Sequence, residues 1–167
     1  MCASTNVIVR KAIAADSGAI LRLIRGLAEY EQLDPPDSAA QQRLLTDAFS
    51  ERPRFDVFLA ELNGEVCGYA FVFETYSTFL ALPTLYLEDL FVLPEFRGSG
   101  AGMALFRKCV EEAQQRGCGR LDWTVLDWNE LAKRFYARLG ATHLQDWQLY
   151  RLSQDQFQGI LDGGKRT

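Results

Sequence analysis

The residues best suited to chemistry lie in a glycine-rich segment, residues 93–102, between an apolar stretch and an amphipathic one. Its glycines, Gly98, Gly100 and Gly102, allow successive backbone N–H groups to face one concavity, because no Cβ stands in the way. The first turn of a following helix would add its own N–H groups and the positive end of its dipole. This pattern predicts a receptor for a diphosphate, with Arg97 supplying positive charge at the rim.

Two common phosphate-binding patterns do not describe this segment. The sequence G-x-x-x-x-G-K-S/T is absent from it, which excludes a P-loop. Met103 stands where the dinucleotide-binding pattern G-x-G-x-x-G needs its third glycine, and no early strand–helix–strand unit precedes it. A plain tight turn is the structural alternative, so the function of the segment depends on its context.

Two polar side chains interrupt apolar surroundings. Glu88 breaks an apolar strand predicted over residues 85–92, and its neighbour Asp89 is expected to face the opposite side. Partial burial would raise the pKa of a carboxyl group such as Glu88 toward a value useful for a general base. Tyr136 follows Phe135 in a predicted helix, and a phenol can donate a proton at neutral pH. The alternatives are an ion pair for Glu88 and simple packing for Tyr136.

An acidic group surrounds one aromatic residue, Tyr30; its members are Glu29, Glu31, Asp34 and Asp37. Carboxylates attract an extended polycation, and an aromatic ring can hold an ammonium group. A solvated acidic loop is an equally good interpretation. The segment is therefore a candidate for binding a cationic small molecule.

Composition narrows the class of protein. The chain has 167 residues with 18 basic and 22 acidic side chains, and the net charge of −4 argues against a nucleic-acid binder. Four cysteines without C-x-x-C spacing and one histidine argue against structural zinc and a disulfide framework. No apolar run approaches the roughly 18 residues of a membrane span, and we expect no signal peptide. We expect one cytoplasmic domain over residues 1–167 that binds no metal or membrane, with its core at 7–152 and a frayed tail at 163–167.

Periodicity and turn residues predict the elements that would position these groups. Alternating or apolar runs predict strands at 7–10, 56–62, 66–73, 85–92, 121–126 and 147–152. Asn63-Gly64 predicts a two-residue hairpin turn between the second and third of them. Helical spacing predicts helices at 16–30, 37–49, 103–116 and 129–139, and Ser153 begins a short terminal helix. The expected N-caps are Asp16 for the first helix, Asp37 or Ser38 for the second and Asn129 for the fourth. The order β-α-α-β-β-β-α-β-α-β predicts an α/β fold with a mixed sheet, in which an antiparallel hairpin region precedes a strand–helix–strand unit.

Two motifs carry a resemblance to a known family. Residues 97–102, Arg-x-x-Gly-x-Gly, match the pattern Q/R-x-x-G-x-G/A, and residues 129–141 begin with Asn, contain Phe-Tyr and end with Gly-Ala. In this the chain resembles the GNAT superfamily of acetyl-CoA-dependent N-acetyltransferases. Residues 20–31, 85–92 and 127–130 are similar to the spermidine/spermine N-acetyltransferase subfamily. Two structural positions depart from that subfamily, because Lys11 and Leu131 stand where many members have proline.

The resemblance implies the GNAT fold, in which the fourth and fifth strands splay apart. Acetyl-CoA then binds with its pantetheine arm placed like an added strand. The implied acetyl-CoA contacts are Leu90, Phe91, Val92, Arg97, Gly98, Ser99, Gly100, Ala101, Gly102, Met103, Asn129 and Tyr136. Tyr136 is implied as the general acid, Glu88 as the acceptor contact and water-relayed base, and Tyr30 as part of the acceptor pocket. Members of the subfamily form homodimers, so a homodimer is expected.

The implied reaction is direct transfer of acetyl from acetyl-CoA to a primary amine of a small cationic acceptor, without a covalent enzyme intermediate. Polyamines, diamines and thialysine are the leading acceptors. Acetylation of an amino acid, an aminoglycoside or a protein N-terminus is the nearest alternative. A non-catalytic CoA-binding module is an alternative of another class, and it would need neither Tyr136 nor Glu88.

Overall fold

The computed structural model describes residues 6–163, which form two units, one ending at Thr124 and one beginning at Val125. Cys2 and residues 164–167 of the expected frayed tail lie outside the described residues. A single domain over the whole chain stays a prediction. Within residues 6–163, no helix combines the length and apolar character needed to cross a membrane.

The first unit is built on one five-stranded sheet in which strands follow each other in chain order. The strands are β1 (Val7–Lys11), β2 (Asp56–Leu62), β3 (Glu65–Ser77), β4 (Leu82–Val92) and β5 (Arg120–Trp123). The first three pairings are antiparallel and the last, between β4 and β5, is parallel. Asn63 and Gly64 connect β2 to β3 with φ values of 54° and 84°, as the predicted two-residue hairpin turn requires.

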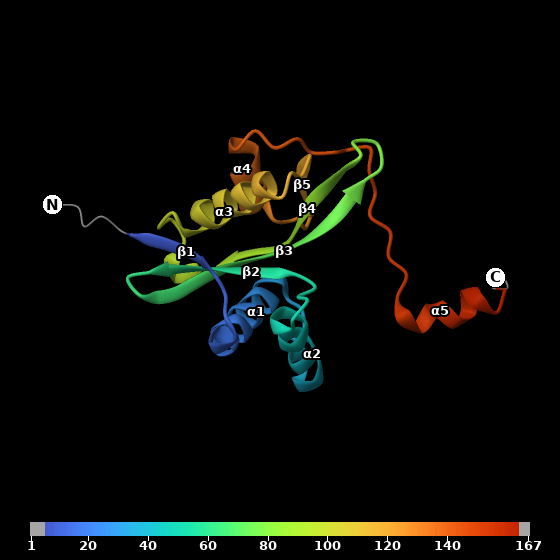
Figure 1. Cartoon of the computed structure of the whole chain (residues 1–167), viewed down its shortest axis with the longest axis horizontal. Helices are drawn as coiled ribbons and strands as arrows, with labels where there is room; N and C mark the ends of the chain where they lie inside the picture. The colour runs from blue at the N-terminus through green and yellow to red at the C-terminus, as the bar shows by residue number, and fades with distance from the viewer. Residues whose placement is uncertain (1–5, 164–167) are drawn as a thin grey trace. The chain divides into compact units, whose positions relative to one another are not determined.

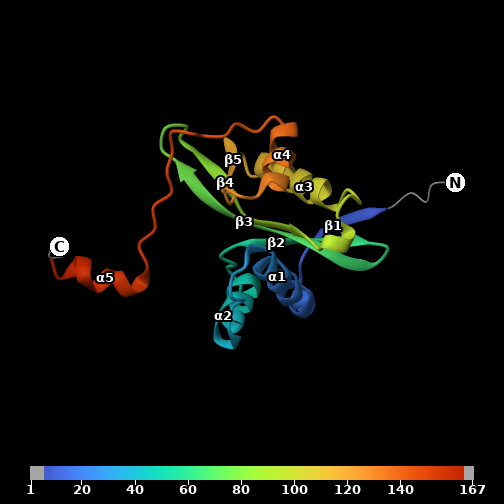
Figure 2. The ribbon, with the colours of Figure 1, turned by 180° about the vertical axis from the view of Figure 1, so that it is seen from behind.

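Helices cover both faces of this sheet. In Figures 1 and 2, α1 (Ser17–Glu31) and α2 (Ser38–Phe49) lie on one face, and α3 (Ala101–Gln115) lies on the other. Two short 3-10 turns, η1 (Ala14–Asp16) and η2 (Pro94–Phe96), precede α1 and α3. The mixed α/β architecture expected from the sequence is therefore confirmed.

The core beneath α1 joins that helix to the middle of the sheet. It is one cluster of buried side chains, comprising Ala12, Ile20, Leu23, Val57, Leu59, Tyr69, Phe71 and Phe91. On α3, Leu105 and Cys109 are fully buried, and Cys67 of β3 is buried as well. All three described cysteines lie in apolar-periodic segments, which predicts small core residues; this is confirmed for Cys67 and Cys109, whereas Cys118 is only half-buried. Burial of this apolar area supplies the main driving force for folding.

A network of ion pairs joins the end of α3 to β1 and β2. The guanidinium of Arg116 donates to a carboxylate oxygen of Asp56 at 2.6 Å and to one of Glu112 at 2.9 Å. Lys11 of β1 pairs with the same Asp56 carboxylate. Burial opposes ionisation of Asp56, but the hydrogen bonds from Lys11 and Arg116 outweigh it and lower the pKa of this carboxyl group. This network ties α3, β1 and β2 together.

The second unit contains α4 (Glu130–Arg138) and α5 (Gln154–Leu161). The side chain of Asn129 accepts a hydrogen bond from the N–H of Ala132 at 3.1 Å, so the predicted cap of α4 is formed. After α4, Gly140 has φ +79°, the left-handed conformation that commonly ends a helix. The predicted boundaries of this helix are confirmed to within a residue.

The predicted strand at residues 147–152 is wrong. These residues adopt no regular structure. The alternation of Trp147, Leu149 and Tyr150 resembles that of a strand, but all three side chains are exposed and make no ladder in the described part of the second unit. A strand forms only where a neighbour accepts its hydrogen bonds, and alternation alone does not supply one.

Three smaller expectations also change. The strand predicted to reach residue 126 ends at Trp123, whereas β3 and β4 are longer than predicted. Asp16 precedes α1 but makes no cap; its carboxylate instead accepts a bond from the N–H of Ile13 and pairs with Arg10 at 2.7 Å. The hydrogen bond from Arg10 lowers the pKa of Asp16.

The close approach of β3 to β4 gives a stability prediction. A Cβ added at Gly68 would lie 2.7 Å from the carbonyl oxygen of Phe91 and 3.0 Å from a methyl group of Val92. Because backbone must move to admit it, we expect Gly68→Ala to lower the free energy of unfolding by about 1–3 kcal/mol. Gly18→Ala in α1, where an added Cβ meets nothing within 4 Å, is the control and should cause no loss. Equal unfolding midpoints in urea for the two variants would contradict this account.

Candidate functional site

The candidate site begins where β4 parts from β5. Their parallel pairing ends at Leu87 of β4, opposite Trp123 of β5. Beyond that point β4 runs on to Val92 paired with β3 alone. The other edge of residues 88–92 therefore faces no strand in the part of the chain that the structure describes. An edge of this kind offers backbone N–H and C=O groups to an extended ligand, as a further strand would use them.

A β-bulge lies at this fork. Phe71 of β3 pairs with Asp89, but the next residue, Val72, pairs with Leu87, so Glu88 is an extra residue on β4. Bulges of this kind redirect side chains and strengthen the local twist of a strand. Glu88 is exposed and Asp89 is half-buried. The bulge interrupts the regular alternation on which the expected opposite orientation of these two carboxylates was based.

The glycine-rich turn follows directly after β4 and η2. Gly98 has φ +82° and Gly100 has φ +93°, and residues other than glycine rarely adopt this backbone conformation. A Cβ built on either residue meets no atom within 4 Å, so the space in front of this backbone is open. Gly100 is also the N-cap residue of α3, which places the helix N-terminus at the turn. Open backbone at a helix N-terminus fits the predicted diphosphate receptor.

Some of the predicted N–H donors are already used within the chain. The N–H of Arg97 donates to the carbonyl of Pro94 at 3.2 Å, and the N–H of Ser99 donates to Phe96 at 3.3 Å. The hydroxyl of Ser99 in turn accepts a bond from the N–H of Ala101 at 3.3 Å. The donors that remain for an anion are consequently those of Gly98, Gly100, Gly102 and Met103. Fewer residues are therefore available to bind an anion than the whole glycine-rich segment contains.

Arg97 joins the turn to the end of α1. Its Nε donates to the carbonyl oxygen of Val92 at 3.2 Å, and its guanidinium lies 4.6 Å from the ring centroid of Tyr30 and 5.8 Å from that of Phe91. This cation–π contact joins Arg97, which was expected to bind the diphosphate of the donor, to Tyr30, which was expected in the acceptor pocket. Arg97 was expected at the rim of the turn; its side chain lies back over α1.

Sequence reasoning missed one residue of the site, Tyr69. This tyrosine is fully buried, and its hydroxyl donates to Oδ2 of Asp89 at 3.0 Å. Burial raises the pKa of Asp89 to about 6, against the lowering effect of the Tyr69 hydrogen bond and with the added effect of the charges on Glu88 and Glu31. Tyr69 looks like any apolar residue of its strand, and only the pairing of β3 with β4 brings it to Asp89.

The remaining predicted residues lie in the second unit or along β4. Tyr136 is half-buried on α4, with its ring centroid 5.2 Å from that of Phe135, and Asn129 caps the same helix. Leu90 and Val92 are half-buried on the open stretch of β4, whereas Phe91 is buried in the core. Among residues 6–163, no group of three or more His, Cys, Asp or Glu side chains is arranged to hold a metal ion.

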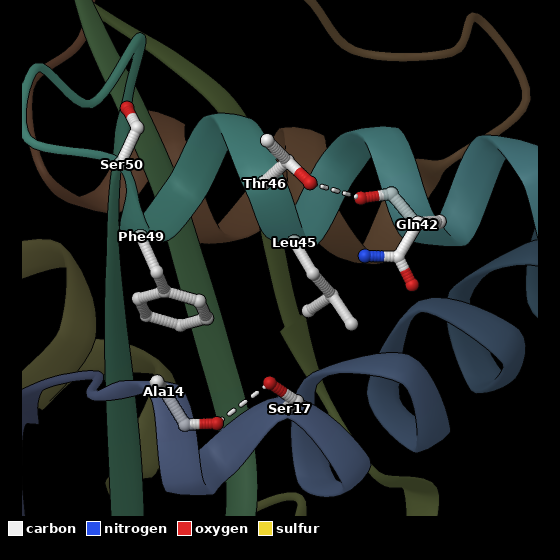
Figure 3. Close-up of a pocket in the computed structure, with 7 residues that line it drawn as sticks. All are labelled: Ala14, Ser17, Gln42, Leu45, Thr46, Phe49 and Ser50. Atoms are coloured by element: carbon white, nitrogen blue, oxygen red, sulfur yellow. Dashed lines mark hydrogen bonds between the residues drawn. The ribbon is translucent and has the colours of Figure 1, made fainter.

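A hollow elsewhere in the first unit has different chemistry. It has a volume of about 370 Å³ and lies between the start of α1 and α2. Figure 3 shows the residues that line it. Its polar groups bond locally, since Ser17 Oγ donates to the carbonyl of Ala14 and Thr46 Oγ1 donates to that of Gln42. It is lined by seven residues without a titratable side chain, namely Ala14, Ser17, Gln42, Leu45, Thr46, Phe49 and Ser50. This hollow supplies no acid or base.

The chain is similar to known proteins in both sequence and structure. Residues 22–141 match the sequence profile of the acetyltransferase (GNAT) family. The chain is 40% identical over 156 residues to the thialysine N-epsilon-acetyltransferase of Bos taurus, with 87% of this chain and 91% of that protein covered. It is 38% identical over 160 residues to the Mus musculus protein of the same name, at 89% and 92% coverage. An integron cassette protein from the V. cholerae mobile metagenome matches in structure with TM-score 0.78, 25% identity and coverage of 93% and 97%.

Proposed function

The chain belongs to the acetyltransferase (GNAT) family, and from that premise we propose that it transfers acetyl from acetyl-CoA to a primary amine of a small cationic acceptor. That it is an N-acetyltransferase follows from the family and from relatives 38–40% identical over most of the chain. The observation that carries the finer proposal is the open edge of β4, which leads from two carboxylates at the bulge to a glycine-rich turn at a helix N-terminus.

The donor side of the site uses mostly backbone. The N–H groups of Gly98, Gly100, Gly102 and Met103 would hold the diphosphate at the start of α3. The open backbone of residues 90–92 would pair with the pantetheine arm, and Asn129 would add a contact from α4. When bound, acetyl-CoA supplies an acetyl group that is activated as a thioester. Glycine at these positions lets the ligand approach the backbone closely.

Proton transfers are assigned to two side chains. An alkylamine resembles lysine, with a pKa of about 10.4, so the acceptor arrives as an ammonium ion and must lose a proton before it can attack. Glu88, exposed at the bulge, contacts the acceptor and assists this loss, directly or through water. Tyr136 donates a proton to the departing thiolate. The acetyl group passes directly to the amine, without a covalent enzyme intermediate.

The acceptor side is acidic and aromatic. Burial raises the pKa of Glu31 at the end of α1, and the charges of Glu31 and Glu88 both act on Asp89. Tyr30 precedes Glu31 on α1, and the guanidinium of Arg97 lies over its ring. Clustered carboxylates attract a cation, which favours a diamine, polyamine or thialysine-like acceptor. The names of the bovine and mouse relatives support a thialysine-like amine.

We also propose a homodimer located in the cytoplasm. At the tip of the β3–β4 hairpin Phe79 is 98% exposed, and the apolar side chains of Leu80 and Leu82 are exposed beside it. A cluster of exposed apolar side chains of this kind supports burial against a second copy of the chain. Cys67, Cys109 and Cys118 are free thiols, which agrees with a reducing compartment.

The glycine-rich turn gives a binding prediction. Gly100→Val puts a branched side chain into the open space at the start of α3 and strains a residue with φ +93°. We expect acetyl-CoA affinity, measured by calorimetry, to fall at least tenfold, because the anion can no longer reach the backbone. Gly159→Val, in α5 where an added Cβ also meets nothing within 4 Å, is the control. Undiminished affinity in a folded Gly100→Val protein would show that the turn does not bind the donor.

The role of Tyr136 can be separated from binding. We expect Tyr136→Phe to leave acetyl-CoA affinity nearly unchanged while kcat falls by about 10²-fold or more, the range that a general acid supplies. The matched control is Tyr150→Phe, since Tyr150 is an exposed residue of the same unit. Thiol release in stopped-flow assays measures kcat, and an unchanged rate would remove Tyr136 from the mechanism.

The acceptor itself is found with an amine panel. Thialysine, lysine, spermidine, spermine and an aminoglycoside are each mixed with enzyme and acetyl-CoA, and released thiol is measured. We expect the highest kcat/KM for a thialysine-like or polyamine acceptor, and a higher KM for it in Glu88→Gln. A clear preference for the aminoglycoside would support the alternative acceptor class. Tight acetyl-CoA binding without thiol release for any amine, including protein N-termini, would favour the non-catalytic module.

A further inference from the structure

A second carboxyl group at the bulge is held more firmly than Glu88. Asp89 is half-buried, and one of its oxygens, Oδ2, accepts the hydroxyl hydrogen of Tyr69 at 3.0 Å. Tyr69 has no exposed surface, and its ring packs edge-on against Phe91 with 6.4 Å between centroids. Because burial raises the pKa of Tyr69 well above its ordinary value, its hydroxyl stays protonated and continues to donate. One Asp89 oxygen is therefore fixed, and the other is left for another donor.

The position of Asp89 matches the path expected for the reacting groups. It is the second residue beyond Leu87, where the pairing of β4 with β5 ends. The open stretch of β4 then runs through residues 90–92 toward the turn at Gly98 and Gly100. Strands rise about 3.3 Å per residue, so Asp89 lies roughly 10 Å along β4 from Val92. A donor anchored at the turn and extended along this edge would bring its acyl end to the bulge.

The charges around Asp89 suit a group that gains and loses a proton near neutral pH. It is faced by Tyr69 from β3, by Glu31 from the end of α1 and by Glu88 on its own strand. Burial first, and then the charges of the two carboxylates, raise the pKa of Asp89, whereas the hydrogen bond from Tyr69 lowers it; together they bring it to about 6. General bases are most effective when their pKa lies near the working pH.

We propose that Asp89 is the group on which the acceptor's proton comes to rest, and that Tyr69 is the positioning residue that holds Asp89 for this step. This deepens the proposed function and depends on it: Glu88 contacts the acceptor's ammonium group, and the proton passes to the Asp89 oxygen that Tyr69 does not hold. An N–H bond of the ammonium breaks, and its electron pair forms the new bond from nitrogen to the acyl carbon. The C–S bond of the thioester breaks with its electron pair on sulfur, and sulfur receives a proton from Tyr136. The nitrogen loses its second proton, which passes through solvent to the Tyr136 oxygen and restores the phenol, and Asp89 releases the first proton to solvent.

Tyr69→Phe tests the positioning role with the loss of one oxygen atom. Without the hydroxyl, the pKa of Asp89 should rise, and the acid limb of kcat/KM against pH should move to higher pH. If the acid limb moves up by one pH unit, kcat/KM at a given pH on that limb should fall about tenfold, whereas kcat/KM on the plateau at higher pH should be retained. Tyr76→Phe is the matched control, because Tyr76 is an exposed tyrosine on the same strand. Its pH profile should match that of the parent.

A readout that needs no turnover accompanies the kinetics. The carboxyl carbon of Asp89, assigned by its loss in Asp89→Asn, is titrated by NMR in the unliganded protein, with an expected midpoint near 6 and a higher one in Tyr69→Phe. The raised pKa also makes ionised Asp89 unfavourable in the fold. The free energy of unfolding should therefore fall as pH rises from about 4 to about 6, and Asp89→Asn should lack this fall.

Two substitutions at the bulge separate the carboxylates and do not depend on the folding of Tyr69→Phe. Asp89→Asn should lower kcat at least tenfold with little change in acceptor KM, and Glu88→Gln should chiefly raise that KM. An Asp89→Asn enzyme with the parent's kcat and pH profile would overturn the inference, as would an acid limb that stays in place in Tyr69→Phe while the NMR midpoint moves. If the parent protein acetylates no amine, the proposed function fails and takes this inference with it, whatever the NMR midpoint.

Discussion

The separation of β4 from β5 after Leu87 is the constraint on which the candidate site depends. If the parallel pairing continued, the backbone edge of residues 88–92 would be satisfied by a neighbouring strand, and no ligand could use it. The bulge at Glu88 lies at the same point and accommodates an extra residue where β4 loses its pairing with β5 and keeps that with β3. At one point of the sheet, the end of the β4–β5 pairing leaves a backbone edge open and the bulge places two carboxylates beside it.

Features determined by nearby residues could be predicted from the sequence. The Asn63-Gly64 turn, the cap at Asn129 and the open turn at Gly98 and Gly100 each depend on a few consecutive residues, and all are present. The order of elements up to α4 follows from periodicity, because apolar side chains must share one face of a strand or helix. These local signals, with the two family motifs, were enough to locate the turn and to suggest its chemistry.

Features determined by pairing between distant segments could not be predicted. The extra residue at Glu88 is visible only once the register of β3 against β4 is known. The same register brings the hydroxyl of Tyr69 to Asp89, and the packing of α1 brings Tyr30 under Arg97. The error at residues 147–152 has the same origin, since strand propensity without a hydrogen-bonding neighbour does not make a strand. The Asp16 carboxylate likewise serves Arg10 and Ile13 rather than the helix it precedes.

Arg97 gives the two halves of the site a shared cation. Its side chain touches the ring of Tyr30 and the carbonyl of Val92, while its backbone forms part of the turn that precedes Gly98. A guanidinium can stack on an aromatic ring while its N–H groups face an anion. For the proposed donor and acceptor sites we therefore expect coupled affinities, so an altered Michaelis constant for one substrate in an Arg97 variant would not identify which substrate the arginine contacts.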